Sequence, residues 1–460
     1  MKKLVSLLLV LMLAACIVPS FAEEDEYPEI VEGIDFGGAT LYINPYWAEP
    51  DRVENPDEDV QAMYDFRDWI MKAYHVNIVY EQLGGWGDSQ VEEIRNIIDQ
   101  KDSNTYRVIL MPMGFVGSPM ANSWFADWAD NDLIDLSDTK YNAGITDFMT
   151  KGDSVYGVTY GVEPRACLFF NKKILKDADI DYNEIYDLQK NGEWTWDKLE
   201  EYCKKLQKDE DADGVPEVYG ITGNINDLYM CAVFSNGGSF FDFNDEGKLA
   251  ITAGSENTIE ALSWVAQLWQ NYGRAQAWPE EDWDYFINVF KSGNAAFCVH
   301  QTYGGYNDPP CDFSDMQDDW GCVMIPMGPK GEDYKFMVSE NIGIIPNIYD
   351  KETKDKIQFI WDLYNSTAPG VDEETAWIGN KYTNTRGDTR AVDETYALMR
   401  EPKSGAADKS LYLGDNNTVL GSSTGVNYLW GVLWGNPQEL LEGITPFWNS
   451  LLDTFNNPAQ

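Results

Sequence analysis

The fold class is decided by residues 76–111, which read VNIVYEQLGGWGDSQVEEIRNIIDQKDSNTYRVILM. Residues 76–80 and 106–111 are short apolar runs, a pattern typical of buried β-strands. Between them, the apolar side chains of residues 91–98 recur every three to four positions, which predicts an amphipathic helix beginning at Asp88. A strand–helix–strand unit of this kind predicts a parallel sheet with crossover helices.

The same alternation of strands and helices continues on both sides of this stretch. Residues 38–43 predict an opening strand, and residues 60–74 predict the helix that leads to the strand at 76–80. The sequence therefore predicts an α/β fold, and its 460 residues are enough for about two domains with cores of their own. Further helices are expected at 195–206, 257–272, 354–364, 389–399 and 437–455.

Composition excludes several classes of protein. The chain contains 17 Trp, 26 Tyr and 20 Phe, which favours a globular protein over a disordered one. Its 77 acidic residues against 33 basic ones give a formal net charge of −44. Because such a surface repels phosphate backbones, we expect no nucleic-acid partner, and polyanionic ligands are also disfavoured.

The amino terminus predicts export. Lys2 and Lys3 precede an apolar run at residues 4–15 that is too short to span a bilayer comfortably, as in a signal peptide. Two cleavage sites fit: a lipobox that would lipidate Cys16 and leave residues 1–15 as the signal, or cleavage after Ala22. Both alternatives place the mature chain outside the cytoplasm, as a cell-surface lipoprotein or as a secreted or periplasmic protein.

Cysteine and histidine usage gives two further expectations. The six cysteines of the body form no CxxC pair, and a protein of this size does not need disulfides, so buried thiols are expected. Cys298, Cys311 and Cys322 could still include one disulfide pair. With His75 and His300 as the chain's two histidines, the sequence argues against a zinc site.

An acidic loop at residues 209–217, DEDADGVPE, has the spacing of a calcium-binding turn. Carboxylates stand at its first, third, fifth and ninth positions, with Gly214 at the sixth for the turn. The twelfth position is Gly220, where an EF-hand has a bidentate Glu, so the loop is not a full EF-hand. We expect a structural Ca²⁺ here, the alternative being a solvated acidic turn, and no cofactor for function. The expected ligands are Asp209, Asp211, Asp213, Val215 and Glu217.

Six sequence blocks carry a resemblance to a known family. They are VYGVTY at 155–160, LFFNK at 168–172, WTWDKL at 194–199, NGGSF at 236–240, FKSGNAAF at 290–297, and IPMGP at 325–329 with ENIGI at 340–344. In this order they resemble motifs of bacterial extracellular solute-binding proteins of the maltose-binding family, although WTWDKL lacks the family's proline. The resemblance covers nearly the whole mature chain.

This resemblance implies an architecture and a function. The family has two α/β lobes joined by crossing segments, with the ligand in the cleft between the lobes. Lobe 1 would comprise residues 30–158 and 330–365, and lobe 2 residues 159–329 and 366–460. The chain would then be a non-catalytic, monomeric component of an ABC importer that delivers its solute to a membrane permease. The abundance of aromatic residues favours a sugar, above all a neutral oligosaccharide.

Candidate ligand residues follow from strand ends and from the family's pattern. Polar and aromatic side chains beyond the carboxyl ends of strands suit a sugar site. The first, second and third strands are followed by Asn44 and Trp47, by Trp86, and by Met113, respectively. The resemblance adds Glu163, Arg165, Tyr303 and Tyr306 in lobe 2. Further candidates in the C-terminal region are Trp377, Arg386 and Trp430. The alternative is that the tryptophans are core residues and that Glu163 and Arg165 form an ion pair at the hinge.

Two other function classes were weighed against the binding protein. Abundant carboxylates and aromatics also suit a secreted glycoside hydrolase, but 77 acidic residues make any carboxylate pair uninformative. A surface adhesion protein without a small ligand is the second alternative. The sequence contains no GxSxG, P-loop or HExxH motif, so other catalytic signatures are missing.

Overall fold

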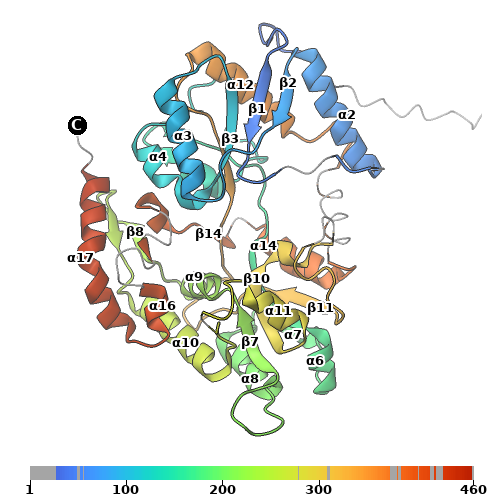
Figure 1. Ribbon diagram of the computed structural model, residues 1–460, viewed down its shortest axis with the longest axis vertical. Helices are drawn as coiled ribbons and strands as arrows, with labels where there is room; N and C mark the ends of the chain where they lie inside the picture. The colour runs from blue at the N-terminus through green and yellow to red at the C-terminus, as the bar shows by residue number, and fades with distance from the viewer. Residues whose placement is uncertain are drawn as a thin grey trace, which may run out of the picture.

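The computed structural model divides into two lobes stacked along the long axis of the molecule (Figure 1). Residues 1–22, which include both predicted cleavage sites, and Trp377 lie outside the described residues. The structure describes residues 27–48, 52–54, 56–277, 279–307, 311–372, 374, 381, 385–401, 403–414, 419–420 and 428–457.

Lobe 1, at the top of Figure 1, is a four-stranded sheet with helices on both faces. Its elements are β1 (Thr40–Asn44), α2 (Glu58–Ala73), β2 (Asn77–Tyr80), α3 (Asp88–Gln100), β3 (Tyr106–Pro112), η1 (Met113–Phe115), α4 (Gly117–Ala121), α5 (Ala143–Phe148), β4 (Thr150–Lys151), β5 (Ser154–Val155), β13 (Asn341–Ile344) and α12 (Lys351–Tyr364). The strand order is β13-β3-β1-β2, in which β13 runs antiparallel to β3. Helices α2 and α12 share a core with β1 on one face, and α3 packs on the other face. The predicted parallel strand–helix unit is thus confirmed.

Lobe 2 is built on a second four-stranded sheet, of order β11-β6-β10-β7. Strand β10 runs parallel to β7 and antiparallel to β6. All six residues of β6 are buried, because helices cover both faces of this sheet. The elements are β6 (Ala166–Asn171), α6 (Lys172–Asp177), α7 (Asn183–Lys190), α8 (Trp196–Leu206), β7 (Tyr219–Gly223), α9 (Ile225–Ser235), β8 (Phe241–Phe243), β9 (Leu249–Ile251), α10 (Glu256–Tyr272), α11 (Tyr285–Lys291), β10 (Ala295–Gln301), η2 (Thr302–Gly305) and β11 (Trp320–Val323).

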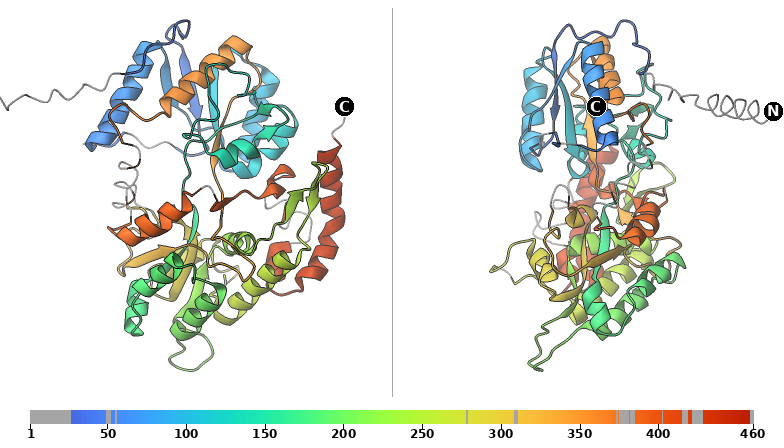
Figure 2. Two further views of the ribbon diagram at one scale, coloured as in Figure 1. Left: turned by 180° about the vertical axis from the view of Figure 1, so that it is seen from behind. Right: turned by 90° about the vertical axis from the view of Figure 1, so that its right-hand side faces the viewer.

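The C-terminal segment packs against lobe 2. Its elements are η3 (Ala391–Tyr396), α14 (Ala397–Met399), β14 (Gly405–Ala406), η4 (Lys409–Tyr412), α16 (Tyr428–Val432) and α17 (Pro437–Asn456). Helices α16 and α17 pack on α10, beside the lobe (Figure 2). The side chain of Asn436 caps α17, and Pro437 follows at a position where a helix tolerates proline.

Two crossing segments that join the lobes are hydrogen-bonded to each other. The Val158 N–H donates to the Gly343 carbonyl at 3.2 Å, and the Gly343 N–H donates back to Val158 at 2.8 Å. A Cβ at Gly157 would lie 2.6 Å from Ile342 Cγ2, so only glycine allows this approach.

The point at which the chain returns from lobe 2 to lobe 1 lies later in the sequence than the predicted residue 330. Strand β12 (Phe336–Met337) pairs with β14 of the C-terminal segment, which places residues 336–337 in lobe 2. The return into lobe 1 therefore starts after Met337 and not at residue 330. The first boundary, predicted between residues 158 and 159, falls at the paired residue Val158.

The lobes also touch through the C-terminal segment. The Tyr412 ring stacks on Phe148 of lobe 1, with centroids 4.5 Å apart, and the Tyr412 hydroxyl donates to the Phe148 carbonyl at 2.8 Å. Leu411 packs in the same hydrophobic cluster as Val116 and Phe148. Tyr412 contacts Phe243 and Phe455 of lobe 2 as well, so one ring bridges both lobes.

Five cysteines of the body are buried. They are Cys167, Cys203, Cys231, Cys298 and Cys322. Among the helices of the described ranges, none combines the length and apolar character that crossing a membrane requires.

Asp408, which caps η4, makes the folding stability depend on pH. It is buried, and its carboxylate accepts hydrogen bonds from the backbone and the hydroxyl of Ser410. Burial raises the pKa of Asp408 from 3.8 to about 6. Between these values the folded state holds the proton more tightly than the unfolded state. The contribution of Asp408 to stability therefore falls as the pH rises, by at most about 3 kcal/mol.

We expect Asp408→Asn to remove this decline, because asparagine does not ionise and still accepts the Ser410 N–H. Measured by calorimetry, the melting temperature of the variant should exceed that of the parent protein. This difference should grow as the pH rises from about 4 to about 7. The exposed Asp245→Asn, in the β8–β9 turn, is the control. If the difference in melting temperature between Asp408→Asn and the parent protein does not change with pH, the assignment of this pH dependence to Asp408 is wrong.

Candidate functional site

The edges of the two sheets that face each other bring the candidate residues together. The parallel strands β1, β2 and β3 end at the edge of lobe 1 nearest lobe 2 (Figure 1). In lobe 2, β7 and β10 end, and β6 begins, at the edge nearest lobe 1. Loops beyond strand ends therefore meet across the crossing segments, the usual position of a ligand site in α/β sheets.

A buried ion pair joins the two crossing segments. Arg165 Nη2 lies 3.3 Å from Glu340 Oε2, and the other oxygen of Glu340 accepts the Glu163 N–H at 3.3 Å. Burial raises the pKa of the Glu340 carboxyl, and the Arg165 guanidinium opposes that rise. The alternative of a Glu163–Arg165 pair does not occur: the two side chains have different ionic partners.

Glu163 binds two groups of lobe 2. Its Oε1 accepts hydrogen bonds from the Tyr306 hydroxyl and from Lys381 Nζ, both at 2.7 Å. The Lys381 ammonium also lies 4.5 Å from the centre of the Tyr306 ring. Burial, together with the Glu163 carboxylate, raises the pKa of Tyr306, so its hydroxyl remains a donor. Sequence reasoning predicted Glu163 and Tyr306 but missed Lys381, which stands in no recognised motif.

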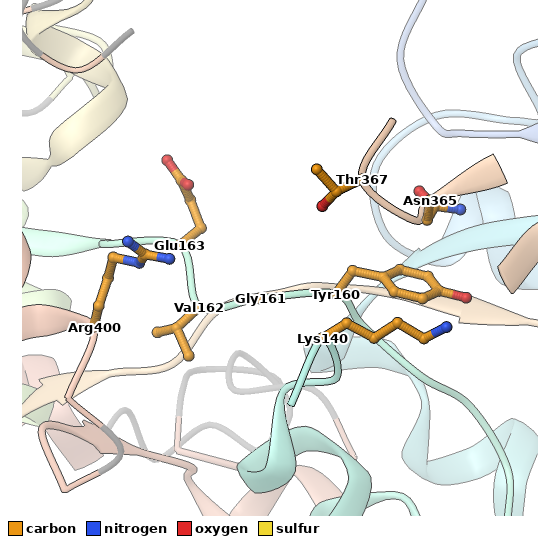
Figure 3. A pocket seen from close by; sticks show the side chains of 8 residues that line it. All are labelled: Lys140, Tyr160, Gly161, Val162, Glu163, Asn365, Thr367 and Arg400. Carbon is orange, nitrogen blue, oxygen red and sulfur yellow. The ribbon is translucent and has the colours of Figure 1, made fainter. Parts of the chain in front are cut away.

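A pocket opens beside this cluster, between the first crossing segment and the end of α12 (Figure 3). It has a volume of about 150 Å³, smaller than most drug-sized ligand pockets. Thr367 and Glu163 reach toward it from different segments (Figure 3). The remaining lining residues are Lys140, Tyr160, Gly161, Val162, Asn365 and Arg400.

Tyr303 offers an aromatic ring on the wall of lobe 2. The side chain, in η2, is 42% exposed, and the ring edge meets His300 at a centroid distance of 5.4 Å. His300 is fixed in turn by Asp312, 2.7 Å from its Nε2. Partial burial, and then the nearby carboxylates of Asp312 and Asp227, raise the pKa of Tyr303 to about 12. The ring therefore stays neutral and presents an apolar face.

Three buried polar atoms without a partner among the described residues lie in segments at this edge of lobe 2. Two of them are acceptors in the first turn of α9, Asn226 Oδ1 and Asp227 Oδ2. The third is a donor, Arg165 Nε. Sequence reasoning predicted Arg165 but missed Asn226 and Asp227. The signal that could have found them is their place directly after β7, at a carboxyl strand end.

Exposed tryptophans extend both walls. Trp283, which is 45% exposed, meets Trp430 edge to face at 5.5 Å, and the two line a small pocket with Gly223 and Ile225 at the start of α9. On lobe 1, Trp86 is 61% exposed and meets Phe115 edge to face at 4.9 Å. Trp430 and Trp86 were predicted, whereas Trp283 was missed.

The first loop of lobe 1 approaches Arg165. Trp47 lies there in edge-to-face contact with Tyr46, with centroids 4.9 Å apart. Burial raises the pKa of Tyr46, and the charge of Arg165 opposes that rise, which places the two side chains close together.

Three predicted ligand residues have structural roles instead. Asn44 is fully buried: its amide donates to the Glu81 carbonyl at 2.8 Å and accepts from Arg107 at 3.0 Å. Met113 is buried in the core beneath η1. Arg386 donates to the carbonyls of residues 313 and 314, within lobe 2.

The acidic loop lies at the far end of lobe 2, below α8 and away from the crossing segments (Figure 1). The carboxylate oxygens of Asp209, Asp211 and Glu217 can come within 4.8 Å of one another. Asp213, in contrast, accepts the Val215 N–H at 2.7 Å. Three of the five predicted ligands thus stand together with the oxygen chemistry that Ca²⁺ prefers.

Comparison with solved structures shows the same fold. The matches include an ABC substrate-binding protein from Listeria monocytogenes in complex with cycloalternan, at 14% identity and a TM-score of 0.59, covering 91% of this chain and 98% of the other. A solute-binding protein from Agrobacterium radiobacter K84 in complex with ribitol has 18% identity and a TM-score of 0.58, covering 91% and 99%. A cyclo/maltodextrin-binding protein complexed with maltotetraose has 14% identity and a TM-score of 0.59, covering 92% and 98%. No curated protein gives a significant match.

The family profile described as bacterial extracellular solute-binding protein matches residues 56–365, which include the sheet of lobe 2, three of the four strands of the lobe 1 sheet and both paired crossing segments. The two lobes, the crossing segments and the candidate cleft between them agree with this match. The chain therefore belongs to the bacterial extracellular solute-binding proteins.

Proposed function

We propose that this protein is the carbohydrate-binding component of an ABC importer, holding its solute between the lobes and delivering it to a membrane permease. The observation that carries the proposal is the half-exposed ring of Tyr303, which has unpartnered polar atoms of Arg165 and Asp227 near it. A sugar has apolar C–H faces that stack on rings and hydroxyl groups that fill such polar positions. The sugar and polyol complexes among the similar structures support the same ligand class.

The crossing segments provide the means of closure. Two backbone hydrogen bonds between Val158 and Gly343 hold the lobes at a narrow junction, so rotation there moves each sheet as a unit. Closure brings Trp86 of lobe 1 toward Tyr303 and Trp283 of lobe 2. The solute is then enclosed between aromatic walls, and the closed molecule is the form that the permease recognises. This role requires no catalytic group.

The predicted signal peptide supports an extracytoplasmic location, free or anchored through Cys16. A lipid on Cys16 would keep the protein at the membrane surface beside its permease. In this role the protein acts as a monomer, because both walls of the cleft come from one chain.

We propose in addition that the acidic loop binds a structural Ca²⁺. The proximity of Asp209, Asp211 and Glu217 supports this site, and Glu217 also fixes the loop by accepting the Glu210 N–H at 2.7 Å. Without a cation the three carboxylates repel one another. Its distance from the cleft assigns the ion to local stability and not to solute binding.

A thermal-unfolding screen against neutral mono- and oligosaccharides tests the main proposal. At a ligand concentration ~100 times the dissociation constant, binding adds about 2.7 kcal/mol to the free energy of unfolding. We expect a clear rise in melting temperature with one sugar class, and chromatography should recover that sugar intact. Shortened products would point to a glycoside hydrolase, and no shift with any sugar would point to an adhesion protein.

Substitution of the aromatic wall tests the location of the site. Trp283→Ala and Tyr303→Ala should each weaken sugar binding by about tenfold or more, since each removes a stacking surface. Trp434→Ala is the matched control, because Trp434 is 76% exposed on the same lobe but does not line the Trp283 pocket. Isothermal titration calorimetry provides the affinities. Equal effects of the three variants would place the site elsewhere.

Chelation tests the calcium proposal. Removing divalent ions should lower the melting temperature, and Ca²⁺ should restore it more effectively than Mg²⁺. Asp211→Asn should abolish the response to Ca²⁺ while leaving sugar affinity unchanged, and Asp245→Asn should keep the response. A parent protein that melts at the same temperature with chelator and with excess Ca²⁺ has no such site.

A further inference from the structure

Asp227 stands at the edge of lobe 2 that faces the cleft. It lies in the first turn of α9, which begins where β7 ends. The Asn224 N–H donates to the Val299 carbonyl at 2.9 Å, so this turn is fastened to β10. The same edge carries Tyr303 and Arg165, beyond the end of β10 and before the start of β6. Asp227 therefore belongs to the wall against which the solute is held.

The carboxylate of Asp227 is buried without a full set of partners. The residue is 4% exposed, and Oδ2 has no hydrogen-bond partner among the described residues, while the side chain of Gln301 faces the carboxylate. Burial raises the pKa of Asp227 from 3.8 to about 6, with His300 and Gln301 opposing the rise. The group is thus ionised in most molecules at neutral pH. An ionised carboxylate in this position lacks the compensation that buried charges normally have.

Two other carboxylates of this wall already have cations. Glu163 is paired with Lys381 at 2.7 Å and Glu340 with Arg165 at 3.3 Å, while Asp312 is bound to His300 at 2.7 Å. No ion pair of Asp227 is found within the described ranges. The titratable groups around it are His300 and Tyr303 from β10 and η2, and Cys231 on α9 itself. None of the three forms an ion pair with Asp227, and the ring of His300 is bound to Asp312.

A second acceptor stands next to Asp227. Asn226 Oδ1 is buried and also has no partner among the described residues. The two unpartnered atoms of this turn are therefore both acceptors. A hydroxyl group donates one hydrogen and also accepts, whereas an ammonium group has three donors and no acceptor. Two unpartnered acceptors in one helical turn, one of them charged, match an ammonium group better than a hydroxyl.

We propose that the solute carries a protonated amine, as an amino sugar does, and that Asp227, assisted by Asn226, is the group that recognises it. This inference rests on the proposed function and names the solute class within it. The ammonium ion supplies the missing counter-charge when the cleft closes. Arg165 Nε remains available for a hydroxyl oxygen, and Tyr303 for the sugar face. The acidic surface, with a net charge of −44, also attracts a cationic solute.

The test compares amino sugars with their closest neutral analogues on the full mature chain. Glucosamine and galactosamine, and their β-1,4-linked di- to tetrasaccharides, are each set beside the N-acetylated form and the parent sugar. Thermal shift screens the set, and isothermal titration calorimetry measures the binders at about pH 7. We expect at least one free amine to bind about tenfold tighter than both of its analogues.

The variant Asp227→Asn separates recognition of the charge from the shape of the site. It should reduce the preference for the amine over its neutral analogues to within about threefold, and its melting temperature should show that it is folded. Asp245→Asn, on the surface of the same lobe, should retain the full preference. Arg165→Ala, in contrast, should weaken amine and neutral sugar alike.

Each of the other outcomes contradicts a specific part of the proposal. If neutral or N-acetylated sugars bind as tightly as the amines, the amine inference fails and the proposed carbohydrate function stands. If Asp227→Asn keeps the preference, another group recognises the amine and the assignment to Asp227 fails. If no carbohydrate of any kind binds to the folded parent protein, the amine inference and the proposed function fail together.

Discussion

The rest of the structure depends on the backbone contact between the two crossing segments. Val158 and Gly343 exchange hydrogen bonds, and neither Gly157 nor Gly343 has room for a side chain: a Cβ at Gly343 would lie 2.8 Å from the Trp361 indole. At this contact the segments that join the two sheets are held together by main-chain hydrogen bonds. A change of side-chain rotamer therefore does not alter their spacing. The candidate site residues Glu163, Arg165 and Glu340 lie within seven positions of this contact in the sequence. Hinge and site are therefore parts of one local structure.

Charge is distributed very differently on the surface and in the cleft. The chain as a whole carries an excess of carboxylates, yet the buried carboxylates near the crossing segments are mostly neutralised one by one. Such pairs contribute little net stability because both partners lose hydration, but they fix the geometry of the groups around them. Against this ordered background, the open acceptors at the start of α9 are the exception. Selectivity in the cleft then arises from the few buried acceptors that have no protein partner among the described residues.

Sequence reasoning predicted the elements with strong periodicity and the order of the lobes, but it placed individual side chains less well. The strands and helix of residues 76–111 appear within one or two positions, since buried strands and amphipathic helices have their own patterns. Asn44 follows a strand, as a ligand residue would, but its amide is satisfied by Arg107 and Glu81, which no local pattern reveals. Asp227 and Trp283 were missed because their roles come from contacts with distant segments. The pairing of β12 with β14 joins two-residue strands far apart in the chain, too short for any periodicity.

The antiparallel strand β13 has a consequence for how the molecule is made. It closes the open side of β3, although about 230 residues separate the two strands. The sheet of lobe 2, by comparison, comes from one continuous stretch of chain. A chain that leaves the ribosome or the export channel amino end first must keep the β3 edge unpaired while the whole sheet of lobe 2 passes. An unpaired edge strand is a template for joining other chains, and like charges on neighbouring copies keep those chains apart. The acidity of this protein thus protects its assembly during the interval in which its first sheet is incomplete.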